Sequence, residues 1–279
     1  MGNYPCGRAI SSGPEGRSAC VADRTSLAAP LPRDQWLIGA TLAAVIALCW
    51  AWIIPMALDM YGPMTGWSAW MMTRTWDFTH QVLLFAMWAV MMIGMMLPSV
   101  MPTSFLYAAV LRKCPHSERV HAHVYAFVAG YLFIWTVFSL FATVLQLLLA
   151  HWLLLTSMME VRNRWLAGAL WLIAGAYQFT PFKRACLECC RSPAAFITHR
   201  LKLGIVGGFR MGATQGLNCV ACCWALMLLL FIGGVMNLWW ISALTILVLL
   251  EKLAPLGVQG GRVLGGLIFA PGLWTLIRI

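Results

Sequence analysis

The sequence predicts an all-α fold, a polytopic bundle of about seven transmembrane helices with a cytoplasmic N-terminus. Hydrophobic residues make up 61% of the chain and charged residues only 10%. Soluble domains carry about a quarter charged residues, so this composition could not supply a polar surface. The apolar residues form continuous runs rather than the alternating pattern of a membrane β-barrel. A helical membrane protein is therefore expected.

Apolar runs long enough for one crossing contain about 18 to 25 residues. The predicted crossings are Trp36–Leu58, Phe78–Met101, Tyr125–His151, Trp165–Phe179, Gly216–Met236, Leu238–Leu253 and Val263–Ile277. Pro98 and Pro102 each interrupt the backbone hydrogen-bond ladder, which predicts a kinked extension of the second crossing to Leu111. A tight hairpin at residues 233–237 is expected to join the fifth and sixth crossings.

The chain divides into two parts by composition. Residues 1–35 are rich in Gly, Pro, Ser and Arg and lack an apolar core. They are too polar for a signal peptide, which predicts a disordered cytoplasmic tail. Residues 36–279 form the predicted transmembrane domain.

The distribution of Lys and Arg predicts the orientation in the membrane. Of the 19 such residues, fifteen lie in connections on the side of the N-terminus and four on the opposite side. Cytoplasmic loops carry the excess of positive charge, so the N-terminus is expected in the cytoplasm and the C-terminus outside. The predicted location is a prokaryotic plasma (inner) membrane, crossed several times. The net charge of +10 is explained by this topology, with the lipid bilayer as partner and no nucleic acid.

Two cysteine triplets share the spacing Cys-x-x-Cys-Cys. They are Cys186, Cys189 and Cys190, followed by Cys219, Cys222 and Cys223. Spacings of three and four bring side chains near one face of a helix. Both triplets are predicted at the cytoplasmic side, where thiols stay reduced and a disulfide framework is not expected. Clustered thiolates suit Cu(I) and Zn(II), although cysteine also serves simply as a small apolar packing residue.

A methionine-rich stripe marks the second predicted crossing. At 100° per residue, Met87, Met91 and Met95 lie within an arc of about 80°. His80 and Asp77 fall on the same arc, near the outer boundary of the membrane. Thioethers are soft, neutral ligands that suit Cu(I) at mid-membrane depth, where a charged ligand would be costly. Methionine is also a common packing residue, so core packing is the competing interpretation.

The strings Met87–Pro98, Ala174–Pro193 and Gly216–Pro255 resemble a bacterial family that carries a domain-of-unknown-function label. Its members are described as predicted metal-binding integral membrane proteins, and the resemblance covers most of residues 77–256. The shared motifs are a Met-rich helix that ends in Leu-Pro, a Tyr-Gln-x-Thr-Pro-x-Lys string before the first triplet, and Cys-x-x-Cys-Cys-Trp. The resemblance implies a metal site and names no substrate or reaction.

The sequence therefore predicts a membrane protein that binds a soft metal, copper with zinc as the alternative, and handles or moves the ion across the membrane. No nucleotide-binding loop, zincin pair, nucleophile elbow or haem-attachment motif occurs in the sequence, which argues against an enzyme. Partners from the same reasoning are a metal chaperone or a membrane complex. The alternative functions are a subunit of a membrane oxidoreductase that holds a redox metal, and a structural subunit.

Overall fold

The computed structural model describes residues 33–60, 78–114, 120–152, 156, 159–253 and 257–277, and the predicted N-terminal tail lies almost entirely outside them. Within these residues the fold is all-helical, as predicted, and contains no strand. The helices are α2 (Arg33–Met60), α4 (Phe78–Arg112), α5 (Val120–His151), α6 (Arg164–Gln178), α7 (Pro181–Arg191), α8 (Pro193–Arg200), α9 (Ile205–Leu228), α10 (Leu230–Gly233), α11 (Leu238–Leu253) and α12 (Gly257–Ile277).

The predicted count of seven helices is wrong, because the described residues form more helices than that. In the described part of the chain, four helical stretches are long and apolar enough to cross a membrane: 35–60, 78–112, 120–151 and 205–233. The helices α6 and α11 lie where crossings were predicted but have only 15 and 16 residues. Two further helices, α7 and α8, form in the connection 183–210. Periodicity could not predict them because they are short and polar.

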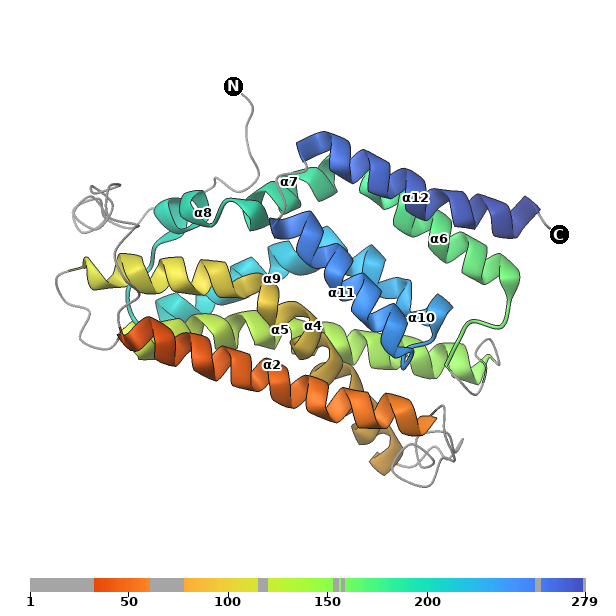
Figure 1. Ribbon diagram of the computed structural model, residues 1–279, viewed down its shortest axis with the longest axis horizontal. Helices are drawn as coiled ribbons and strands as arrows, with labels where there is room; N and C mark the ends of the chain where they lie inside the picture. Colours follow the sequence, from red (N-terminus) through yellow and green to blue (C-terminus); the bar gives the residue numbers. More distant parts are fainter. Residues whose placement is uncertain are drawn as a thin grey trace.

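Individual boundaries agree with the sequence at several points. The helix α4 runs through Pro98 and Pro102 to Arg112 and changes direction along its length (Figure 1), as expected for a proline-interrupted helix. A turn separates α10 from α11, with Gly234 at φ 88° and the amide of Asn237 donating to the Gly234 carbonyl. The fifth predicted crossing, by contrast, begins at Ile205, well before Gly216.

The parallel helices α5 and α9 form the closest contact in the bundle. A Cβ atom added to Gly212 of α9 would lie 1.7 Å from the carbonyl oxygen of Phe127 on α5. One added to Gly130 of α5 would lie 2.1 Å from the carbonyl oxygen of Phe209. Without a hydrophobic driving force in lipid, small residues stabilise helix pairs by allowing their backbones to approach. The two glycines therefore fix how α5 and α9 are placed beside one another.

The remaining helices surround this pair. The helix α4 packs between α2 and α5, and its central residues are buried. An antiparallel pair, α6 and α12, lies at the edge of the molecule opposite α2 (Figure 1). The short helix α7 packs on α9. The helix α11 ends beside the middle of α4 and α9, since its last turn reaches Ser99 and Cys219.

Candidate metal centre

The helix α7 brings the first cysteine triplet to the second. It begins with Pro181 at its first position, and the hydroxyl of Thr180 accepts a hydrogen bond from the amide of Lys183. This combination is favoured at helix starts because it satisfies an unpaired amide and proline needs none. The helix then packs along α9, which carries the second triplet.

Thiols of the two triplets meet at Cys190 and Cys222. The Cys190 thiol lies beside that of Cys222, and this contact together with burial raises the pKa of Cys190 well above its ordinary value. Cys222 also interacts with the thiols of Cys219 and Cys223. Cys186 is half-buried, and its thiol interacts with that of Cys222 at longer range. The structure thus joins one thiol of α7 to three of α9.

Cys189 does not join this cluster. The structure records Cys189 as disulfide-bonded, contrary to the expectation that the triplets would be fully reduced. The geometry of α7 gives a reason why the triplet divides. Successive residues differ by 100°, so Cys189 diverges from Cys190, whereas Cys186 and Cys190, four residues apart, share a face. The six cysteines in the two triplets therefore contribute five free thiols.

The thiols of the second triplet are held by their own helix. Cys222 donates to the carbonyl oxygen of Cys219 at 3.1 Å, and Cys223 donates to the same oxygen at 2.9 Å. All three residues are buried. A thiol that donates to its own backbone must lose that proton, and with it the hydrogen bond, before it can bind a metal as a thiolate. The cluster therefore holds its soft donors in a hydrogen-bonded state.

Cys219 belongs to a closed ring of four hydrogen-bonded side chains, together with Ser99, Tyr131 and Lys252. Lys252 Nζ lies 2.8 Å from Cys219 Sγ and 3.1 Å from Ser99 Oγ. The hydroxyl of Tyr131 lies 2.9 Å from Cys219 Sγ and 3.1 Å from Ser99 Oγ. Each member comes from a different helix: α4, α5, α9 and α11. The ring places a buried ammonium and a buried phenol at the sulfur of Cys219.

The neighbouring carboxylate has a separate partner. Glu251 Oε1 and Oε2 lie 2.8 and 2.9 Å from Lys183 Nζ, and both side chains are buried. Lys183 also donates to the side-chain oxygen of Gln178, and Arg191 Nε donates to the Glu251 carbonyl at 2.6 Å. Glu251 and Lys252 are adjacent in the sequence but contact different helices, because adjacent residues on a helix lie about 100° apart.

The methionine stripe lies in the core of α4. Met87, Met91 and Met95 are fully buried, and so are the flanking Met92 and Met96. Burial therefore does not distinguish the stripe from its flank. The imidazole of His80 is half-buried, and its Nδ1 has no hydrogen-bond partner. Asp77 lies outside the described residues.

No preformed metal site exists among the residues that the structure describes. No three His, Cys, Asp or Glu side chains there are arranged so that they could hold an ion. The donors that do gather are thiols, with buried thioethers on the neighbouring helix α4. Such donors prefer Cu(I) over hard cations such as Mg²⁺.

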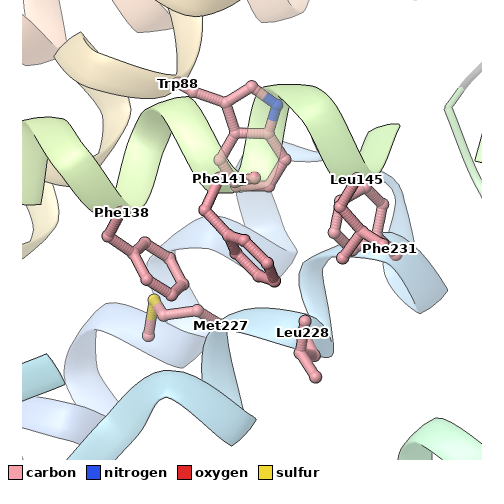
Figure 2. Close-up of a pocket in the computed structure, with 8 residues that line it drawn as sticks. Trp88, Phe138, Phe141, Leu145, Met227, Leu228 and Phe231 are labelled. Atoms are coloured by element: carbon pink, nitrogen blue, oxygen red, sulfur yellow. The ribbon is translucent and has the colours of Figure 1, made fainter. Parts of the chain in front are cut away.

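A separate shallow apolar depression lies at another part of the bundle. Figure 2 shows Trp88, Phe138 and Phe141 around it, with Met227 opposite. Trp88 Nε1 donates to Gln146 Oε1 at 2.6 Å. The lining offers a single thioether and no thiol, imidazole or carboxylate, which makes it unsuitable for a metal.

The sequence analysis did not identify Ser99, Tyr131 or Lys252 as residues of the site. A signal for Lys252 existed, since an ionisable residue in an apolar helix is costly and usually functional. Serine and tyrosine carry no comparable signal because both are common in membrane helices. Their role depends on a meeting of four helices, which no spacing within one helix reveals.

Comparison with known proteins identifies the family. The sequence profile of PpoB2, described as a copper chaperone, matches residues 85–275, a range that contains both cysteine triplets, the methionine stripe and Lys252. No curated protein and no solved structure matches the chain. The metal-related family expected from the motifs is thereby found, and its description names copper. The chain belongs to the PpoB2 family of copper chaperones.

Proposed function

We propose that the protein binds Cu(I) within the membrane at the thiols of Cys190, Cys219, Cys222 and Cys223 and passes the ion on to an acceptor. The family description supports copper as the cargo. Long apolar helices support a location in the bilayer, and the charge distribution supports a prokaryotic inner membrane with the N-terminus inside.

The observation that carries the proposal is the contact between Cys190 and Cys222. These residues belong to different triplets and different helices, yet their thiols lie close enough to interact directly. A pair of thiols that can reach one ion from two helices is the minimum that a soft-metal site needs. The ion would replace the hydrogen bonds of Cys222 and Cys223 to the Cys219 carbonyl. Loading and release would thus exchange hydrogen bonds for metal–sulfur bonds, as suits a carrier rather than a permanent site.

The methionine stripe supplies a route to these thiols. The thioethers of Met87, Met91 and Met95 lie along α4, which contains Ser99 a turn beyond Met95. Neutral soft ligands can hold Cu(I) at membrane depth without adding buried charge. Asp77 and His80, at the other end of the stripe, would receive the ion. Zn(II) is disfavoured on this route because thioethers are poor ligands for it. If Cu(I) uses the whole route, the protein moves the ion across the membrane.

The proposal is tested by Cu(I) binding to the purified protein in nanodiscs under anaerobic conditions, in competition with a chromophoric Cu(I) chelator. The double variant Cys190→Ser, Cys222→Ser should lose at least about tenfold in affinity, since serine oxygen is a hard ligand. Cys49→Ser is the matched control because Cys49 is also a free, buried thiol but lies on α2. Equal affinity in the wild type and both variants would defeat the proposal.

A further inference from the structure

Lys252 is the one buried cation in the described residues that touches the thiol cluster. It is the penultimate residue of α11 and is 7% exposed. Its ammonium lies 2.8 Å from Cys219 Sγ, which is a close contact between a cation and a sulfur atom. A lysine in such a position has lost most of its hydration, which is costly unless an anion compensates its charge.

No carboxylate among the described residues fills that role. The nearest one in sequence, Glu251, accepts both of its short contacts from Lys183. The groups that do contact Lys252 Nζ are the Ser99 hydroxyl and the Cys219 sulfur. Its charge is therefore directed at a residue of the cysteine cluster rather than at an acidic side chain.

The hydrogen bonds of the ring hold the ammonium in this direction. The Ser99 hydroxyl donates to the Met96 carbonyl oxygen at 2.8 Å, which leaves its oxygen free to accept from Lys252. An ammonium has only donors, so Lys252 must use acceptors on both sides. The Tyr131 hydroxyl approaches Cys219 Sγ as well, at 2.9 Å. Two polar groups thus converge on one sulfur atom.

We propose that Lys252 is the counter-ion of the copper–thiolate complex, a positioning residue that never binds the metal itself. This inference rests on the proposed function. Cu(I) held by the thiolate of Cys219 and one other thiolate, with the remaining thiols of the cluster protonated, has a net charge of −1, and an unpaired anion inside the membrane is expensive. The ammonium of Lys252 beside Cys219 makes the assembly neutral. The site would then accept Cu(I) as a neutral unit and release it without leaving a charge unpaired.

The test is a charge-matching cycle of four proteins, with Lys252→Arg as a fifth, each measured for Cu(I) affinity in nanodiscs. Lys252→Met should weaken binding by at least about tenfold, because the complex would keep its buried negative charge. Lys252→Arg should retain most of the affinity, since arginine restores the charge and the donors. Cys219→Met replaces a thiolate by a neutral thioether that still binds Cu(I). In that background Lys252→Met should cost little, because no negative charge remains to be balanced.

Two further measurements separate this role from others. X-ray absorption at the copper edge should give the same sulfur coordination in the wild type and Lys252→Met, whereas a metal ligand would change it. Thermal unfolding without metal checks folding, and removal of an isolated buried charge should leave the midpoint unchanged or raised. Equal Cu(I) affinity in wild type and Lys252→Met, or an equal loss in both cysteine backgrounds, would overturn the inference alone. Absence of Cu(I) binding by the wild type would overturn the proposed function with it.

Discussion

Gly212 of α9 faces Phe127 of α5 so closely that a Cβ atom on the glycine would lie 1.7 Å from the phenylalanine carbonyl oxygen. The obstacle is backbone, which cannot move aside as a flexible side chain can. The position of α9 beside α5 depends on this approach, and with it the distance between Tyr131 and Cys219.

Gly212→Ala should therefore destabilise the protein, by about 1–3 kcal/mol or more, as overpacking of a close interface does. Gly266→Ala is the control, since a Cβ atom at Gly266 on α12 meets nothing within 4 Å. Alanine in an open helical position is neutral or stabilising by up to about 1 kcal/mol. The prediction is tested by comparing the thermal unfolding midpoints of both variants with that of the wild type in the same detergent. Equal midpoints would show that α5 and α9 can separate without cost.

The buried pair of Lys183 and Glu251 gives a second prediction. Lys183→Met removes one partner and leaves a carboxylate inside the protein, which typically costs about 3–5 kcal/mol. The double variant Lys183→Met, Glu251→Gln removes both charges and should be less destabilised than the single one. Arg184→Met on the same helix is the control, because Arg184 contacts only the Phe179 carbonyl in an exposed position. A double variant that is worse than the single one would contradict this account.

The methionine stripe is tested by comparing two leucine substitutions. Met91→Leu and Met92→Leu both act on buried residues of α4 and should cost less than about 1.5 kcal/mol each, since the volumes are similar. If Met91 is a ligand and Met92 a packing residue, bound Cu(I) should fall only in Met91→Leu. Stability and copper content are measured on the same samples. Equal copper content in both variants and the wild type would assign the stripe to packing.

Protection of thiols from alkylation tests whether the two triplets share one ion. Addition of Cu(I) should slow the alkylation of Cys190 and of Cys222 together, measured by mass spectrometry after partial unfolding. Replacement of Cys222 by Ser should remove the protection at Cys190, because the remaining ligand set is incomplete. Cys49, on α2, should react equally with and without copper. Undiminished protection of Cys190 in the Cys222→Ser protein would mean that α7 binds the ion by itself.

Orientation in the membrane is tested with reporter fusions. The excess of Lys and Arg on one side predicts that a reporter active only in the cytoplasm works after Arg119 and after Arg200. The same reporter fused after Ile279 should be inactive. The four long helices do not by themselves fix the side of the C-terminus, so this measurement also decides whether the short helices α6, α11 and α12 cross. Activity at Ile279 would show that one of them, or all three, do not cross.

The apolar runs and the prolines of α4 were sufficient to predict most helices, because in lipid the backbone must satisfy its hydrogen bonds within each segment. They failed between Lys183 and Arg210, where α7 and α8 are stabilised by contacts with other helices. The cysteine triplets and the methionine stripe could be recognised as candidate soft-metal donors from residue type and spacing. The pairing of Cys190 with Cys222, the disulfide at Cys189 and the ring around Cys219 could not, because each depends on which helices are neighbours. Spacing along one helix contains no such information.

The ring around Cys219 also has an order of assembly. Ser99, Tyr131 and Cys219 belong to helices that leave the ribosome before α11, whereas Lys252 arrives last. The helix α11 carries two charged residues near its end, Glu251 and Lys252, and could not enter lipid cheaply alone. Its partners, Lys183 on α7 and Cys219 on α9, are by then already synthesised. Insertion of α11 is therefore expected to be a late step that needs a folded acceptor, so a chain stopped after α10 would hold its thiols without completing the site.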